Sequence, residues 1–127
     1  MNRFGLLVPL LLAAVALTGA GQASENPFTG DVAAVEEGRA LMGAVCGGYC
    51  HATTEGEATD APDLLDCEWW HGDTDTDLFG VIREGVPDTR MQGFGGILPD
   101  DDIWRLVTVI RADSRCEEGD GAAPDPR

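Results

Sequence analysis

Six consecutive residues near the middle of the chain carry its most specific chemical pattern: Cys46-Gly47-Gly48-Tyr49-Cys50-His51. Two thiols followed directly by an imidazole form the attachment pattern for haem, in which two residues usually separate the cysteines. Here three residues separate them. Gly47 and Gly48 tolerate backbone conformations that other residues resist, so we expect them to absorb the extra residue as a bulge. The motif predicts one haem c bonded through Cys46 and Cys50, with His51 as the proximal iron ligand.

The first part of the chain has the pattern of an export signal. A short positive start precedes an apolar run over residues 6–17, and small residues then lead to a polar segment. Because the run is short for a membrane span, we expect residues 1–23 to be a signal peptide cleaved after Ala23. An uncleaved anchor is the alternative. The prediction is an exported, soluble periplasmic domain over residues 24–116, without stable membrane insertion, followed by a polar tail over 117–127.

The charge of the chain is strongly acidic. It holds 23 aspartates and glutamates against eight arginines and no lysine, for a formal net charge of −15. Phosphate binding needs a basic patch, so this composition argues against a nucleic-acid partner. A negative charge of this size favours solubility, and it can steer the protein toward a basic surface.

The segment before the motif has helical periodicity. Apolar residues recur at three- and four-residue intervals from Val32 to Val45, and Asp31 is a suitable N-cap. We therefore expect a helix over residues 32–45 that delivers the chain to Cys46. A glycine inside a helix costs about 1 kcal/mol relative to alanine. Gly38 is best explained if another helix passes close over it.

Two further helices are expected after the motif. An acidic start at residues 73–77 precedes an apolar pattern that runs to about Glu84 and stops at a glycine. The last helix is expected to begin after Pro99, with Asp100 or Asp101 as its cap, and to end near residue 113. The segments 52–66 and 85–98 are expected loops, and strand patterns are nearly absent. The expected class is all-α, with three to four helices and long loops wrapped around one haem.

These features resemble a small class I cytochrome c. The resemblance rests on Gly38-Arg39 ahead of the motif, Pro62 after it, and Met91 on the loop before the last helix. It implies the cytochrome c fold, in which the first and last helices cross at the glycine. It also implies that Pro62 positions a carbonyl group against the second nitrogen of His51, and that Met91 is the sixth iron ligand. Such His/Met ligation raises the reduction potential.

A closer resemblance is to the cytochrome cL type, which serves quinoprotein alcohol dehydrogenases. It rests on Leu64-Leu65-Asp66 followed by Trp69-Trp70, and on the segment 76–79 before Met91. It implies a dehydrogenase that uses pyrroloquinoline quinone as electron donor, and an oxidase or another cytochrome as acceptor. Trp69 and Trp70 are candidates to lie along the haem edge, with an indole N–H donating to a propionate. Plain core filling is the alternative for both.

Two cysteines, Cys67 and Cys116, remain after the motif takes its pair. Export and an even remainder favour a disulfide between them, and a reduced buried pair is the alternative. A different use of the same residues is a structural zinc site, since Cys67 and His71 have the same spacing as Cys46 and Cys50. An acidic exported chain is a poor zinc-finger candidate, so haem is the favoured interpretation.

The resulting interpretation is an electron carrier rather than an enzyme. With His51 and Met91 on the iron, electrons are exchanged and no substrate binds there. The spacing of Met42 on its helix makes it an expected core residue. His71 is the rival sixth ligand, and a haem sensor or peroxidase-like protein is the alternative function if Met91 binds weakly.

Overall fold

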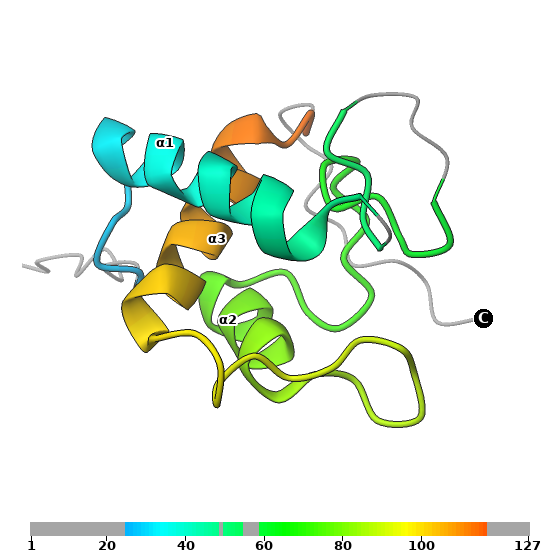
Figure 1. Ribbon diagram of the computed structural model, residues 1–127. Helices are drawn as coiled ribbons and strands as arrows, with labels where there is room; N and C mark the ends of the chain where they lie inside the picture. The colour runs from blue at the N-terminus through cyan, green and yellow to red at the C-terminus, as the bar shows by residue number, and fades with distance from the viewer. Residues whose placement is uncertain (1–24, 49, 55–58, 117–127) are drawn as a thin grey trace, which may run out of the picture.

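The described part of the chain is an assembly of helices and long loops (Figure 1). The computed structural model describes residues 25–48, 50–54 and 59–116, so the expected signal peptide, Tyr49 and the expected tail lie outside the described residues. Four helical elements follow in chain order: α1 Val32–Leu41, η1 Met42–Cys46, α2 Asp75–Glu84 and α3 Asp100–Asp113. In these described residues the only β-type pairing is an isolated bridge. The predicted all-α class is confirmed.

Helix α1 begins where its cap was expected. The Asp31 carboxylate accepts hydrogen bonds from the backbone N–H groups of Ala33 and Ala34, at 2.9 and 3.2 Å. The predicted helix over 32–45 is one continuous helical segment whose geometry changes at Met42, where the π-helical η1 begins. The backbone N–H groups in the first turn of a helix have no acceptor within the helix. The Asp31 carboxylate supplies one, and this explains why α1 begins at Val32.

Helices α1 and α3 cross closely at Gly38, and this crossing is the largest helix–helix contact of the fold (Figure 1). A Cβ atom placed on Gly38 would lie 3.0 Å from the carbonyl carbon of Arg105 and 3.2 Å from the Cβ of Val109. Only hydrogen at this position lets the two backbones approach so closely. The predicted reason for the glycine is therefore confirmed.

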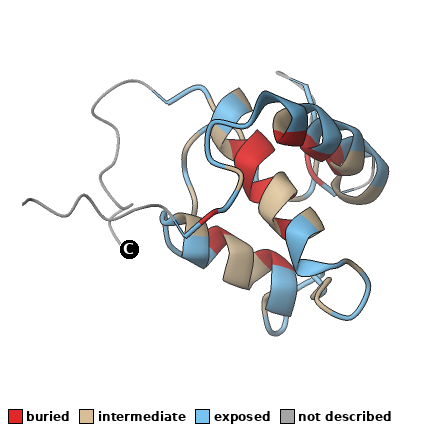
Figure 2. Ribbon diagram, turned by 90° about the vertical axis from the view of Figure 1, so that its left-hand side faces the viewer, coloured by how far each residue is buried: buried red, intermediate tan, exposed pale blue. Residues whose placement is uncertain are grey.

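The core lies between α3 and the two other α-helices, and Figure 2 marks the buried residues of these helices in red. Ile103, Leu106 and Val107 are fully buried, so α3 forms the centre of the core. The buried cluster consists of Met42, Leu78, Ile82, Ile103, Leu106, Val107, Val109 and Ile110. Met42 is 7% exposed, which confirms it as a core residue. Burial of these apolar side chains is the main favourable term for so small a domain.

The N-terminal lead-in is attached to the same helix by a buried polar pair. The Asn26 amide donates to the Thr108 hydroxyl at 3.0 Å, and that hydroxyl lies 2.8 Å from the Trp104 carbonyl oxygen to which it can donate. Both residues of the pair are at most 4% exposed. Because buried polar groups are costly when unpaired, this contact fixes where the segment before α1 lies.

The N-termini of α2 and α3 differ. Thr74 caps α2 in a reciprocal box, in which its hydroxyl accepts from the Asp77 N–H while the Asp77 carboxylate accepts from the Thr74 N–H. The expected Asp100 or Asp101 cap of α3 is wrong, since the N-cap is Pro99 and no side chain caps it. The helix does begin directly after Pro99, as expected, but Pro99 itself is the extended N-cap residue, with φ −59° and ψ 151°. The aspartates lie in the first turn of α3, where their negative charges interact favourably with the positive end of the helix dipole.

Candidate haem-attachment site

The six-residue motif follows one wide helical turn and is itself spanned by a second, which makes room for the extra residue between its cysteines. The Gly47 N–H donates to the Met42 carbonyl at 2.9 Å, and the His51 N–H donates to the Cys46 carbonyl at 3.0 Å. Each bond joins residues five apart, as in a π-turn, whereas an α-turn would hold one residue fewer. Gly48 takes a left-handed φ of +80°, which glycine adopts without penalty. The extra residue is thus absorbed by π-type turns, which are often found at functional sites.

The His51 imidazole is buried and held in one orientation. Its Nδ1 lies 2.8 Å from the carbonyl oxygen of Pro62, and the residue is 8% exposed. Because a carbonyl oxygen only accepts, Nδ1 must carry the proton, which leaves the lone pair of Nε2 free for a metal. This is the arrangement that an iron-ligating histidine requires.

Both thiols of the motif are free to form thioethers. Cys46 is half-buried and borders the core, while Cys50 is exposed. Burial, with a smaller contribution from Cys50, raises the pKa of the Cys46 thiol to about 11. The Cys46 sulfur is therefore a neutral thiol at physiological pH. Two thiols and an imidazole with a free Nε2 form a donor set that suits covalent haem.

The Met91 loop is held against the end of α2 by backbone contacts. The Val86 N–H donates to the Met91 carbonyl at 2.9 Å, and Phe94 and Gly95 donate to the last turn of α2. A Cβ on Gly93 would lie 2.7 Å from the Glu84 carbonyl, so the loop approaches the helix as closely as glycine allows. Met91 is partly buried and packs against the same core that Cys46 borders. A thioether is thus available beside the core as a soft ligand.

The two tryptophans lie in different environments, and Trp69 packs partly buried against the core, which was one of the two positions expected for it. The indole N–H of Trp69 donates to the Leu64 carbonyl at 3.0 Å, and the Arg111 guanidinium lies 4.5 Å from its ring centroid. An indole has one donor, so the expected Trp69 bond to a propionate is corrected: that N–H is already used. Trp70 is 67% exposed, which excludes core filling for it. A place for Trp70 along the haem edge stays a prediction.

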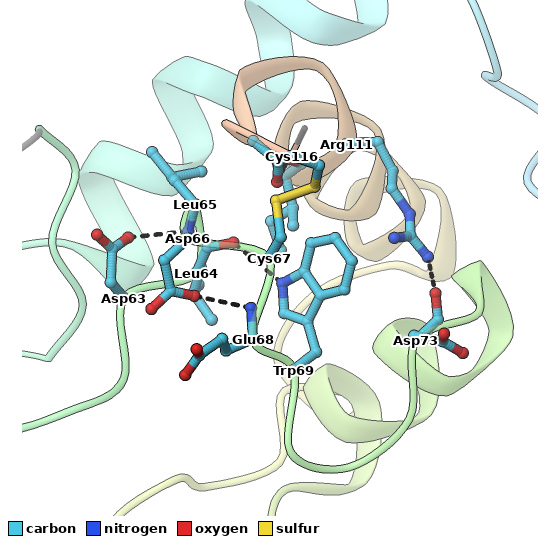
Figure 3. Close-up of a disulfide and its surroundings, with 12 residues drawn as sticks. Asp63, Leu64, Leu65, Asp66, Cys67, Glu68, Trp69, Asp73, Arg111 and Cys116 are labelled. Carbon is cyan, nitrogen blue, oxygen red and sulfur yellow. Dashed lines mark hydrogen bonds between the residues drawn. A yellow bond between two sulfur atoms is a disulfide. The ribbon is translucent and has the colours of Figure 1, made fainter. Parts of the chain in front are cut away.

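A disulfide joins Cys67 to Cys116, as the favoured interpretation expected (Figure 3). This bond removes Cys67 from any zinc site, so the zinc alternative is wrong. Within the described residues no cluster of three or more histidine, cysteine or acidic side chains could hold a metal ion. His71, the rival to Met91, is exposed at the surface.

Two residues near the site had no signal in the sequence. Arg115 donates from its guanidinium to the Asp63 carboxylate at 2.9 Å, and its backbone N–H donates to the Leu65 carbonyl at 2.9 Å. These contacts hold the residues that follow Pro62. Arginine and aspartate are frequent at surfaces, and 52 residues separate this pair, so only the packing of α3 brings them together.

The helices, the motif and the donor set together define a c-type cytochrome domain. The chain belongs to the family described as cytochrome c oxidase, cbb3-type, subunit III, whose family model matches residues 33–109, more than half of the chain. That match includes the motif, Pro62 and Met91, and it makes this a protein with covalently bound haem c. A search of curated proteins and a search of solved structures gave no match. Among the described helices, none has the length and apolarity to cross a membrane.

Proposed function

We propose that the protein is an exported monohaem electron carrier with His/Met ligation. Cys46 and Cys50 form the thioethers, His51 is the proximal ligand and Met91 the distal one. The observation that carries this proposal is the 2.8 Å contact between His51 Nδ1 and the Pro62 carbonyl, which leaves Nε2 as the metal-binding nitrogen. When bound, the haem supplies an iron that cycles between the ferric and ferrous states.

The residues of the chain then hold that iron for electron transfer. His51 is kept in one tautomer by Pro62, so the proximal nitrogen keeps its orientation through the redox cycle. Met91 is carried on a loop with two backbone bonds to α2, and its thioether would be the second protein ligand of the iron. An apolar environment around the iron would exclude water and favour the less charged ferrous state. With both ligands bound, the iron would have no open position for a substrate.

The proposed partners are redox proteins, in keeping with an electron carrier. The proposed electron donor is a dehydrogenase, more specifically one that uses pyrroloquinoline quinone. The proposed acceptor is an oxidase or another cytochrome. All six described arginines form ion pairs with carboxylates, at Arg39, Arg83, Arg90, Arg105, Arg111 and Arg115. In the described part of the chain, every arginine is therefore already paired with a carboxylate, and the remaining carboxylates give the surface its net negative charge. Such a surface would attract a partner with a basic surface. The proposed location is the periplasm.

The test is expression of the full chain with a working haem-attachment system, followed by mass spectrometry and spectroscopy. We expect one haem added to a chain that starts near Ser24, and a Soret band that survives acid–acetone extraction. A near-infrared charge-transfer band from methionine on ferric iron should be lost in Met91→Ala and kept in the matched control His71→Ala. A colourless protein would refute the proposal, and the reverse band pattern would move ligation to His71.

Ligand exchange separates the electron carrier from a haem sensor or peroxidase-like protein. With Met91 on the iron, ferrous wild-type protein should bind carbon monoxide slowly, because the thioether must first leave. The Met91→Ala variant should bind it rapidly. Rapid binding in wild-type protein would contradict electron transfer as the function and support the sensor or peroxidase class.

A further inference from the structure

The segment after Pro62 is attached to the end of α3 at several points. Figure 3 shows residues 63–69 curling around the disulfide beside the last turn of α3. Cys67 is bonded to Cys116, and the Arg115 N–H donates to the Leu65 carbonyl at 2.9 Å. The indole of Trp69 closes the segment on itself through the Leu64 carbonyl, at 3.0 Å. We call residues 63–69, together with their contacts to Arg111, Arg115 and Cys116, the proximal clamp.

The clamp reaches directly to the residue beside Pro62. One carboxylate oxygen of Asp63 accepts from the Arg115 guanidinium at 2.9 Å, and the other accepts from the Leu65 N–H at 2.8 Å. Asp63 follows the Pro62 carbonyl across a single planar peptide bond. Fixing Asp63 therefore fixes the direction in which the Pro62 carbonyl points, and that carbonyl is the partner of His51 Nδ1.

The backbone at Cys67 has an unusual conformation that its surroundings must hold in place. Cys67 has φ +70°, in the left-handed region that residues with a Cβ rarely occupy. Such a conformation persists where surrounding bonds over-determine it. On the other side of the segment, the Arg111 guanidinium stacks on Trp69, donates to the Asp73 carbonyl and donates to Asp75 at 2.7 Å. The segment is thus held at both ends by the last turn of α3 and the residues after it.

We propose that the Cys67–Cys116 disulfide and the Arg115–Asp63 ion pair are positioning elements that hold the Pro62 carbonyl against His51, and so set the donor strength of the proximal ligand. The inference rests on the proposed function, since it needs His51 on the iron. A carbonyl that accepts from Nδ1–H raises the basicity of the imidazole and favours ferric iron. Loss of the clamp weakens this bond and shifts the reduction potential to more positive values.

The test uses the ferric holoprotein and two variants of different severity. Arg115→Gln removes the ion pair and keeps the backbone bond, and Cys67→Ala with Cys116→Ala removes the disulfide. The main readout is the rate at which the hyperfine-shifted Nδ1–H proton of His51 exchanges with solvent in NMR spectra. We expect exchange about tenfold faster in the disulfide variant and an intermediate rate in Arg115→Gln, because exchange follows local opening. The potential should become more positive in the same order.

The matched control is Asp31→Ala, which loses the cap of α1 at the other end of that helix from the motif. It destabilises the fold without touching the clamp, so its Nδ1–H exchange and potential should match wild type. Unchanged exchange in both clamp variants would overturn the inference while leaving a His/Met cytochrome intact. Equal acceleration in Asp31→Ala would also overturn it, since the effect would then be general loosening. If the disulfide variant fails to mature, Arg115→Gln alone decides. Failure of the proposed function would show separately, as wild-type protein without haem or with another ligand set.

Discussion

Replacing Gly38 with alanine should destabilise the protein, although helix propensity alone predicts the opposite. Alanine in a helix interior is favoured over glycine by about 1 kcal/mol. The new methyl group would meet the carbonyl of Arg105, with its carbon 3.0 Å away, and the Cβ of Val109 at 3.2 Å. Neither contact can be relieved by a rotamer change, because backbone and Cβ atoms move only with the helix.

The expected size follows from these two opposing terms. Forcing a methyl group into a tight contact costs up to about 3 kcal/mol, and the helices must separate to accommodate it. Subtracting the propensity gain of about 1 kcal/mol leaves a net loss of up to about 2 kcal/mol. For a domain of this size, a loss of about 2 kcal/mol corresponds to a melting temperature lower by about 8–16 °C, which is the largest shift expected.

The assay is equilibrium denaturation of the holoprotein, followed by circular dichroism in the far ultraviolet. Gly80→Ala is the matched control, because Gly80 also lies inside a helix but nothing lies within 4 Å of an added Cβ. It should be neutral or more stable by up to about 1 kcal/mol. Equal stability changes in Gly38→Ala and Gly80→Ala would show that the helix crossing does not require glycine, and the packing argument would fail.

Three further predictions concern the methionine loop, a buried hydroxyl and an acidic cap. Gly93→Ala places a methyl group against the backbone of α2, so the loop should shift. The near-infrared band assigned to Met91 should then weaken in the absorption spectrum of the ferric holoprotein. Thr108→Val leaves the Asn26 amide without its hydroxyl partner, and should cost about 1–3 kcal/mol in denaturant unfolding. The pKa of Asp77 is lowered, mainly by the hydroxyl and backbone N–H of the α2 cap. Its contribution to stability should therefore be present above the unfolded-state pKa of about 3.9 and be lost as pH falls through the lower folded value, and removal of that hydroxyl should raise the Asp77 pKa in an NMR titration.

The parts of the fold that sequence reasoning predicted are those decided within a few residues. The start of α1 at Val32 depends on a carboxylate one residue earlier, and the buried face of α3 follows from apolar spacing at Ile103, Leu106 and Val107. Gly38 was informative because a glycine that lowers helix propensity needs a reason. The wrong prediction of the α3 cap shows where such local reasoning fails. Pro99 is the N-cap residue, so the aspartates that follow it lie inside the first turn and cap nothing.

In the candidate site, too, the sequence predicted what depends on neighbouring residues, and the structure was needed for the rest. The order of Cys46, Cys50 and His51 favoured haem over zinc as the cofactor, because covalent attachment and proximal ligation both depend on adjacency in the chain, and the disulfide at Cys67 then excluded the zinc site. Two glycines in the motif pointed to a bulge, but only the structure showed π-type turns that close on the Met42 and Cys46 carbonyls. Ligation by Met91 stays a prediction of the motif and the family resemblance.

What only the tertiary structure decided is how the proximal side is held. The indole of Trp69 bonds a nearby carbonyl rather than a propionate, and Arg115 reaches Asp63 across 52 residues. The Cys67–Cys116 disulfide was expected from the number of cysteines, but the structure shows that it joins the loop after the motif to the end of α3 across 49 residues. Such contacts follow from where the end of α3 lies relative to the loop after the motif. That placement is set by the α1–α3 crossing and the shared core, and no local pattern of residues encodes it.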